Sequence, residues 1–487
     1  MATLAQSRIA RSGPLVRPTV AVGLVASILA ALVQSFLMSI DCDVSWLITV
    51  NEKMLAGQRL YVDVVEVNPP ASIWLYTPPV WLAERLGLRP EAVVVALFIA
   101  CALLASGLAL RLGEKLRKPP RPLVFFAALA FVELILPLGT FAQREHAAML
   151  LAFPVLTAFA VIAEGRALSL PVRIAVGAAA GLVITIKPHF ALAIVPAALF
   201  AAWRARAVKP MIPVAAAAAA LVALYAAALL LFTPQYLQML PMLADVYLPL
   251  RERWSILLAG PVVVVPLAIF AIALVLRPRR FAALPAMFLI GSAGFALAGV
   301  IQGKGYLNHA LPGIALGLVG LVLLATDTGV ERGRKFVLAA AAGLACIEFY
   351  AMACIRPIPG LAQAVERVAP PRPSVITLGP DLLTGHPLVR NVDGRWVGSS
   401  AGLYVAAGAH PQIPHAHGEA RARLLRWYEA DVDSFAADVE WAHPDVILVD
   451  TRPDFAWLRK EPKVQRAIAG YIPRARVGDV EVWVRRP

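Results

Sequence analysis

Residues 41–70 read DCDVSWLITVNEKMLAGQRLYVDVVEVNPP and follow the first long apolar run of the chain, at 18–40. The stretch ends on a Pro-Pro pair and carries five acids: Asp41, Asp43, Glu52, Asp63 and Glu66. Carboxylates are costly to hold beside a lipid bilayer, so an acidic segment next to an apolar run indicates a functional site. We therefore interpret residues 41–70 as a candidate functional loop of a membrane protein.

The composition of the whole chain supports this membrane setting. The 487 residues are 60% apolar and 16% charged, with a mean hydropathy of +0.72. A soluble domain has about 45–50% apolar and about 25% charged residues. The net charge of +14 is spread over segments between apolar runs. We therefore expect contacts with membrane lipids and no nucleic-acid partner.

The apolar runs predict eleven membrane-spanning helices. We place them near 18–40, 91–110, 123–142, 146–163, 173–187, 189–203, 211–232, 256–276, 281–301, 307–325 and 335–355. Arg8, Arg11 and Arg17 precede the first run, which indicates a retained first helix with a cytoplasmic N-terminus. An odd number of spans then places the C-terminal tail on the outer side.

Two amphipathic stretches in the first outer segment are not predicted to span. Residues 44–56 follow a helical period and stop at Gly57, which is typical of a helix lying in the membrane interface. Residues 71–87 are too short to span and are broken by Pro78-Pro79, so they predict a second surface helix. The Lys187-Pro188-His189 sequence is either a kink or a tight outer turn, and we favour the turn because it keeps a charge out of the bilayer core.

The character of the chain changes after residue 355. A Pro-rich linker at 356–373 separates the membrane domain, 1–355, from a small α/β domain at 374–487. Residues 374–379 and 445–450 are strand-like and 418–442 are helix-like. Residues 477–486 predict a hairpin or an edge strand.

Five outer loops carry polar residues at the same predicted face of the helix bundle. These residues are Asp41, Asp43, Asp63, Glu66, Asn68, Gln143, Arg144, Glu145, His146, Lys187, His189, Gln302, Lys304, Tyr306, Asn308 and His309. Ionisable groups gathered at the mouth of a bundle indicate a functional site more than the general polarity of loops.

The spacing of these residues resembles the GT-C superfamily of glycosyltransferases. Within it, the chain is similar to the branch of protein O-mannosyltransferases and the lipid A aminoarabinose transferase. The matching pieces are Asp41/Asp43, MLAGQRLYVD (54–63), EVNPP (66–70), QREH (143–146) and QGKGYLNH (302–309). The resemblance covers about residues 1–355, and the tail matches only loosely the periplasmic appendage of such enzymes.

The resemblance implies an activity and a location. A sugar carried on a polyprenyl phosphate would be transferred with inversion to an acceptor hydroxyl of an envelope glycan, lipid or protein. Transfer would take place at the outer face of a bacterial cytoplasmic membrane, with the C-terminal domain in the periplasm. Relatives in this branch generally work without a metal, so we expect no cofactor and leave a divalent metal open.

Such a transfer needs a general base to take the acceptor proton. Asp43 is the first choice, because it matches the first-loop carboxylate of the superfamily by its distance from Met54 and Gly57. Asp41 is a close second, and the acid that is not the base would suit the N-cap of the helix at 44–56. Glu145 is assigned to orienting the acceptor or the first-loop acid, unless it forms a structural ion pair.

Transfer also needs cations that hold the departing lipid phosphate. Arg144 and the Gly-bracketed Lys304 are the candidates, and Lys187 joins them because Asn68 is neutral where relatives carry Lys or His. The remaining expected substrate contacts are His146, Asp63, Glu66, Asn68, Tyr306 and His309. Three histidines, His146, His189 and His309, lack a metal-binding spacing, so a satisfied or phosphate-contacting role is favoured over a metal site.

Two other kinds of protein remain as alternatives. A transporter or flippase of a lipid-linked glycan would carry ionisable groups at mid-membrane, and here only Glu133 and Glu348 lie well inside predicted spans. A non-catalytic scaffold for envelope polysaccharide assembly would not depend on Asp41 or Asp43.

Overall fold

The computed structural model describes residues 13–275, 282–327 and 331–486. Arg8 and Arg11, on which the cytoplasmic N-terminus was predicted, lie outside the described residues. Contacts divide the chain into two compact units. The first comprises Met1–Met38, Val94–Ala227 and Glu252–Ile355, and the second comprises Ser39–Val93, Ala228–Arg251 and Arg356–Pro487.

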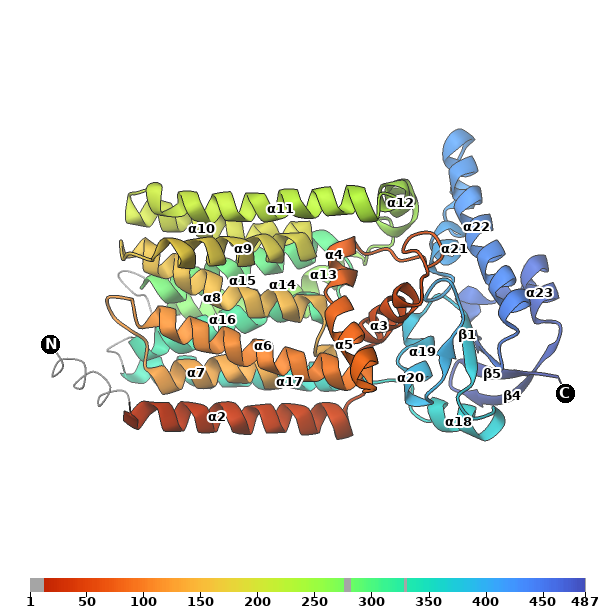
Figure 1. Cartoon of the computed structure of the whole chain (residues 1–487), viewed down its shortest axis with the longest axis horizontal. Coiled ribbons are helices and arrows are strands. Elements are labelled where there is room, and N and C mark those ends of the chain that lie inside the picture. Colours follow the sequence, from red (N-terminus) through yellow and green to blue (C-terminus); the bar gives the residue numbers. More distant parts are fainter. Residues whose placement is uncertain (1–12, 276–281, 328–330, 487) are drawn as a thin grey trace. The chain divides into compact units, whose positions relative to one another are not determined.

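The first unit is a bundle of long apolar helices that run roughly parallel to one another (Figure 1). Its elements are α2 (Gly13–Leu32), η1 (Val33–Leu37), α6 (Pro90–Gly113), α7 (Pro122–Ala130), η2 (Phe131–Ile135), η3 (Leu138–Thr140), α8 (Arg144–Ala163), α9 (Leu170–Ile186), η4 (Pro188–Phe190), α10 (Ala191–Ala205), η5 (Lys209–Met211), α11 (Ile212–Phe232), α13 (Trp254–Ala259), α14 (Pro261–Val275), α15 (Ala283–Gln302), α16 (Leu307–Asp327) and α17 (Glu331–Ala353).

Nine helices among the described residues are long and apolar enough to cross a membrane. Two shorter apolar helices, Pro122–Ile135 and Leu170–Ile186, occupy the other two predicted spans. The all-α polytopic architecture predicted from the sequence is therefore confirmed, whereas the count of eleven stays a prediction. Lys187 has extended backbone and interrupts the helical run between α9 and α10, where the turn was expected.

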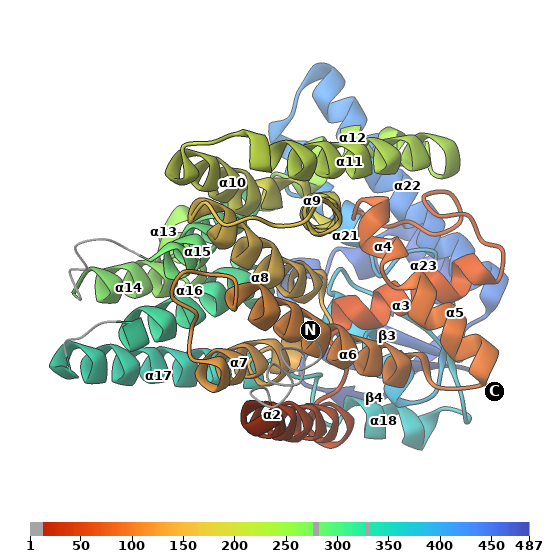
Figure 2. The ribbon, with the colours of Figure 1, turned by 60° about the vertical axis from the view of Figure 1, so that its left-hand side comes forward.

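The centre of the bundle is formed by α8 and α16, each with 89% of its apolar window buried, against 6% for α11. Figure 2 shows α8 surrounded by its neighbours, and it contacts α9, α10, α15 and α16. A helix that is apolar on every side is stable only where other helices or lipid cover it. The first turn of α8 is thus held inside protein, and this turn carries the QREH motif.

Small residues bring some of these helices into close contact. A Cβ at Gly294 of α15 would lie 2.2 Å from the carbonyl oxygen of Leu192 and 2.4 Å from the Cα of Ala193 in α10. Without a hydrophobic driving force between helices in lipid, small residues let backbones approach and pack. The α10–α15 contact therefore depends on glycine at this position.

The second unit holds the first outer segment, which forms α3 (Cys42–Leu55), α4 (Pro70–Trp74) and α5 (Thr77–Leu86). The helix predicted at 44–56 is present and begins two residues earlier. All residues from Val44 to Asn51 are buried, so this part of α3 has no free side for the lipid surface and differs from the interfacial helix that we expected. The stretch at 71–87 forms two short helices, because Pro78 and Pro79 start α5 anew.

The same unit contains α12 (Tyr236–Met242), η6 (Leu243–Tyr247) and the C-terminal α/β domain. The elements of that domain are α18 (Leu361–Val368), β1 (Ser374–Leu378), α19 (Leu382–Gly385), α20 (Leu388–Asn391), β2 (Arg395–Trp396), α21 (Tyr404–Ala409), η7 (Ile413–His415), α22 (Gly418–Ala442), β3 (Val446–Asp450), η8 (Pro453–Phe455), η9 (Leu458–Lys460), α23 (Pro462–Ile468), β4 (Tyr471–Val477) and β5 (Val480–Arg485). Helix α18 lies within the segment expected to be a linker.

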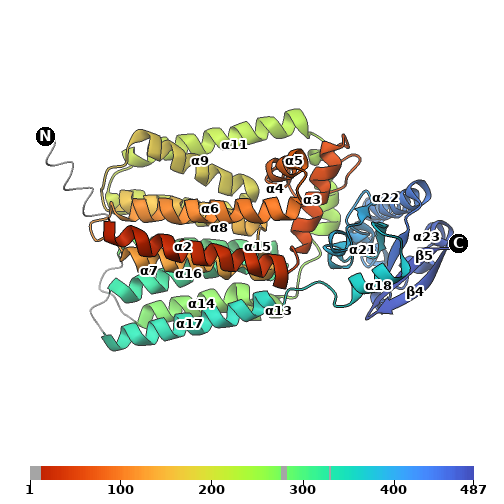
Figure 3. The same ribbon diagram turned by 60° about the horizontal axis from the view of Figure 1, so that its bottom comes forward.

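The strands form one sheet in the order β2-β1-β3-β5-β4. Figure 3 shows β4 and β5 of this sheet side by side near the C-terminus. β1 is parallel to β2 and β3, and β5 pairs antiparallel with both β3 and β4. The predicted strands at 374–379 and 445–450, the helix at 418–442 and the terminal hairpin are thus all present. Both faces of the central strands are covered, since every residue of β1 and β3 is buried.

We expect Gly294→Ala to destabilise the bundle, because the new Cβ would collide with backbone atoms of α10. Overpacking of this kind costs about 1–3 kcal/mol. The thermal transition of the detergent-solubilised protein should fall by several degrees. Gly343→Ala is the matched control, since a Cβ there meets nothing within 4 Å. Equal transitions for the two variants would contradict the close α10–α15 packing.

Candidate active site

In the first unit, three polar loops meet around a buried ion pair. Lys187, at the end of α9, pairs with Glu145 in the first turn of α8. The Lys187 Nζ also donates to the Oε1 of Gln302, at the end of α15, over 3.0 Å. The Nε2 of His309, in the first turn of α16, lies 3.6 Å from the Oε1 of Glu145. The sequence motifs at 143–146, 187–189 and 302–309 are thus brought to one place.

The pair is deeply buried, with side-chain exposures of 0% for Glu145 and 8% for Lys187. Burying one charge alone in a low-dielectric environment costs several kcal/mol, so each of these groups depends on the other. Glu145 thus forms the structural ion pair that we kept as an alternative role for it. The ion pair does not account for every polar atom of the site, because some buried atoms around it have no hydrogen-bond partner among the described residues.

Three buried atoms beside this pair have no hydrogen-bond partner within the described part of the chain. They are the Oε2 of Glu145, the Nε2 of Gln302 and the Nδ1 of His309. Buried polar atoms are nearly always satisfied in a folded protein, by protein, water or a ligand. An acceptor and two nitrogens gathered around a lysine form a place where a polar ligand could complete the network.

Two further cations belong to the same set of loops. Arg144 is buried at the start of α8, next to Glu145 in the chain. Lys304 is almost wholly buried and stands between Gly303 and Gly305, both with a φ of +68°. Left-handed backbone on both sides requires glycine and allows the tight loop that turns Lys304 inward. Tyr306 remains 58% exposed, with its ring 5.5 Å from that of His309.

Both ring nitrogens of His146 contact backbone groups. Its Nδ1 accepts from the amide of Ala142 over 3.0 Å, and its Nε2 lies 2.8 Å from the carbonyl of Glu133. Ala142 has a φ of +64°, an uncommon backbone conformation that this hydrogen bond helps to hold. His146 thus helps to fix the turn that leads into Arg144 and Glu145, and its contact with substrate stays a prediction.

In the second unit, the structure separates the two acids that the sequence left undecided. Asp41 is the N-cap of α3, and its Oδ1 accepts from the amides of Asp43 (2.8 Å) and Val44 (3.3 Å). Capping by Asp satisfies amides at a helix start that have no partner within the helix. Asp43 lies in the first turn of α3 and is half-buried. Asp41 is therefore the N-cap of α3, and the choice of Asp43 as the general base stays a prediction.

Glu66 and Asp63 have partners within residues 41–70. Glu66 is buried and accepts from the Trp46 indole and from the amide of Asn68, which lies at 2.8 Å. Asp63 is partly exposed and pairs with Arg59, whose hydrogen bonds lower the pKa of Asp63 to about 2. Glu66, Asn68 and Asp63 thus help to shape the loop, and their contacts with substrate stay predictions.

Among the described residues, no group of three or more His, Cys, Asp or Glu side chains is placed to hold a metal ion. Sequence reasoning also missed His386 and Arg390, which contact α3 from the C-terminal domain. No sequence signal marks them, since they lie about 340 residues from their partners.

Comparison with solved structures identifies the fold. Over 97% of its length, this chain is similar to 98% of ArnT from Cupriavidus metallidurans in the apo state, with 15% identity and a TM-score of 0.52. The same protein bound to undecaprenyl phosphate matches with 15% identity and a TM-score of 0.52, over 96% of this chain and 97% of that one. An Archaeoglobus fulgidus oligosaccharyltransferase matches with 12% identity and a TM-score of 0.46, over 92% of this chain and 71% of the other.

No protein-family model and no curated protein sequence matches the chain. ArnT is the lipid A aminoarabinose transferase, a GT-C glycosyltransferase. The resemblance drawn from the sequence motifs is therefore confirmed for the fold, which is that of ArnT.

We expect Lys187→Met to destabilise the protein strongly, because it leaves the carboxylate of Glu145 buried without its cation. Breaking one side of a buried pair costs about 3–5 kcal/mol. The double variant Lys187→Met/Glu145→Gln removes both charges and should recover most of the loss in a thermal unfolding assay. A double variant that is as unstable as the single one would contradict the pairing.

Proposed function

We propose that the protein is an inverting glycosyltransferase that moves a sugar from a polyprenyl-phosphate donor to an acceptor hydroxyl. The acceptor would be an envelope glycan, lipid or protein. The observation that carries this proposal is the buried Glu145–Lys187 pair with unsatisfied polar atoms around it, where three loops meet. The ArnT fold supports it, since ArnT has been captured with undecaprenyl phosphate.

The donor phosphate would bind to the cations of the first unit. Lys187, Arg144 and Lys304 are buried or nearly so, and each comes from a different loop of the same face. As the bond between the anomeric carbon and the phosphate oxygen breaks, negative charge grows on the departing lipid phosphate. Fixed cations in a water-poor site stabilise that charge more strongly than they stabilise the donor's single charge.

Glu145 would hold Lys187 in place and offer its second oxygen to a hydroxyl of the sugar or acceptor. His309 could donate or accept at its Nδ1, and Gln302 could donate at its Nε2. A cation paired to a buried carboxylate has a fixed position before substrate arrives. Such preorganisation lowers the barrier because little rearrangement is needed during the reaction.

Asp43 would act as the general base. The acceptor oxygen would attack the anomeric carbon from the side opposite the phosphate, and its proton would pass to the Asp43 carboxylate. The new C–O bond forms as the phosphate bond breaks, and the anomeric configuration inverts. Asp41 would not compete for this role, because its carboxylate is engaged with the amides of Asp43 and Val44.

The proposed setting is the cytoplasmic membrane of a bacterium. Residues 1–355 would form the membrane domain, 356–373 the connection and 374–487 a periplasmic domain, with the N-terminus in the cytoplasm. The nine apolar helices and two shorter ones among the described residues support a multi-pass protein. The positively charged inter-helix segments support this orientation.

We expect Asp43→Asn to lower sugar transfer by about 100-fold or more, because general-base catalysis contributes about 10²–10⁴-fold. Asp41→Asn is the matched control: Asn caps a helix about as well as Asp, so this variant should keep most of its activity. Membranes carrying each protein would be given a panel of polyprenyl-phosphate sugars, and release of the lipid phosphate would be followed.

The reverse ranking, with Asp41→Asn inactive and Asp43→Asn active, would assign the base to Asp41. If both variants behave as wild type in cells that depend on the protein, the first loop is not an active site. If the variants disrupt envelope glycans in cells but the wild-type protein consumes no donor of the panel, the transporter is favoured. If envelope glycans are unchanged in cells that carry either variant, the scaffold is favoured.

A further inference from the structure

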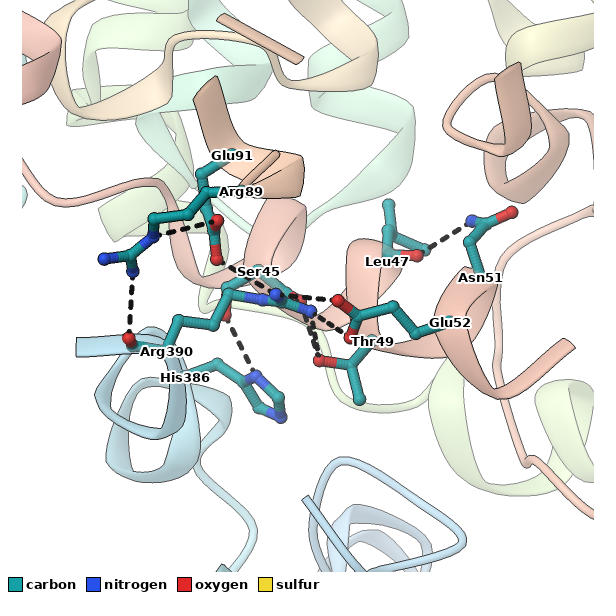
Figure 4. Close-up of polar contacts among 9 residues, drawn as sticks. All are labelled: Ser45, Leu47, Thr49, Asn51, Glu52, Arg89, Glu91, His386 and Arg390. Carbon is teal, nitrogen blue, oxygen red and sulfur yellow. Dashed lines mark hydrogen bonds and ion pairs between the residues drawn. The ribbon is translucent and has the colours of Figure 1, made fainter. Parts of the chain in front are cut away.

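Arg390, in the C-terminal domain, is the centre of a buried polar network in the second unit (Figure 4). It lies at the end of the short helix α20, and its side chain is only 9% exposed. Its partners come from α3 and from the start of α6, both within Ser39–Val93 of the same unit and some 300 residues or more earlier in the chain. This side chain is therefore one of the contacts that join the domain to that part of the chain.

All five donors of the guanidinium are used. The Nε donates to the carbonyl of Ser45 over 3.2 Å. The Nη1 donates to Glu52 over 3.2 Å and to Glu91 over 2.9 Å. The Nη2 donates to the Thr49 hydroxyl over 2.9 Å and to Glu52 over 2.7 Å. An arginine has five N–H groups, so this geometry satisfies the group completely.

Three of these partners lie on one side of α3. Ser45, Thr49 and Glu52 are spaced by four and three residues, which places them along a single face over about two turns. Asp43 lies two residues before Ser45, in the first turn of the same helix. The fourth partner, Glu91, is in the first turn of α6. Arg390 thus holds the orientation of α3 about its own axis.

Other contacts of the domain act on the same face. The Nδ1 of His386 lies 3.1 Å from the Ser45 hydroxyl. Its ring is edge-on to that of Trp46, with centroids 5.4 Å apart, and tilted against that of Trp396, with centroids 4.7 Å apart. Burial, together with the charges of Arg390 and Lys53, holds the pKa of His386 well below its usual value, so the ring is neutral. The neutral ring adds no charge to this contact surface, whose buried cation is Arg390. Arg89, which is largely exposed, also pairs with Glu91 and with Asp393 of the domain.

Lysine could not take the place of Arg390. A lysine offers three donors from one point, whereas these acceptors surround a planar group on several sides. Burial alone would lower the pKa of Arg390, but Glu52 and Glu91 raise it above its usual value. The guanidinium therefore stays charged, and it is the cation paired with the largely buried carboxylate of Glu91 and the more exposed one of Glu52.

We propose that Arg390 is a positioning residue, through which the C-terminal domain sets the orientation of α3 and of Asp43 for sugar transfer. The proposal rests on the proposed function, in which Asp43 is the base. It gives the C-terminal domain a role in the reaction that acts through α3.

The kinetic test compares Arg390→Ala and Arg390→Lys with wild type in the full-length protein. We expect kcat to fall at least about tenfold for both variants, because the general base loses its place. The KM for the polyprenyl-phosphate donor should stay within about twofold, because the proposed phosphate contacts lie on other elements. Guanidinium ion at millimolar concentration should partly restore kcat to Arg390→Ala and leave wild type unchanged.

Arg452→Gln is the matched control. Arg452 is an arginine of the same domain, and its pairs are with Asp381 and Asp450 of that domain. We expect this variant to keep the kcat of wild type. A fall equal to that of the Arg390 variants would indicate general damage to the domain and overturn the proposal, as would a change in donor KM without a change in kcat.

A second measurement does not depend on activity. Amide hydrogen exchange in residues 42–55 should be at least about tenfold faster in Arg390→Ala than in wild type, with peptides of α8 unchanged. Wild-type exchange in α3 would overturn the proposal, even if kcat fell. Faster exchange with unchanged kcat would also overturn it. If wild type transfers no sugar, the proposed function fails, and the exchange result alone decides whether Arg390 holds α3.

Discussion

A buried ion pair organises the bundle of the first unit. Glu145 and Lys187 stand at the ends of different helices, and neither charge would be tolerated there without the other. For the two side chains to meet, the start of α8 and the end of α9 must lie next to each other at the same end of the bundle. The ends of α15 and α16 are drawn to the same place by Gln302 and His309. One electrostatic constraint thus brings together loops that lie up to about 160 residues apart in the chain.

The surrounding residues show how such a site is held in place. His146 uses both ring nitrogens on backbone groups, and the strained Ala142 leads the chain into the first turn of α8. The glycines on both sides of Lys304 permit a loop that other residues would resist. Local strain that persists in a folded protein is held by the structure around it, and it gathers at functional sites.

The second unit follows a different principle, because its acids are mostly fixed by hydrogen bonds. Asp41 caps α3, Glu66 receives the Trp46 indole, and Glu52 is bound by Arg390. Among the acids at the start of α3, Asp43 is the one that the structure does not use as a cap. Residues 44–51 of helix α3 are buried in protein, and the helix is held by contacts both with its own segment, such as Trp46 with Glu66, and with the C-terminal domain.

The sequence by itself determined the membrane class, the positions of the apolar helices, the strands and long helix of the C-terminal domain, and the GT-C resemblance. These features depend on hydropathy and periodicity, which are local properties of the chain. The sequence also indicated that the loops around Glu145, Lys187 and His309 belong to a functional site, because charged residues are rare in so apolar a chain.

Only the tertiary structure decided which polar residues are structural. Asp41 and Asp43 are alike in sequence, and a two-residue difference in position along α3 makes one a cap. His146, Glu66 and Asp63 are of residue types that are common in functional sites. In the structure, their partners are backbone groups or side chains of the same loop. The role of Arg390 depends on acceptors some 300 residues away or more, and a hydrogen bond between distant segments leaves no local pattern from which a single sequence could predict it.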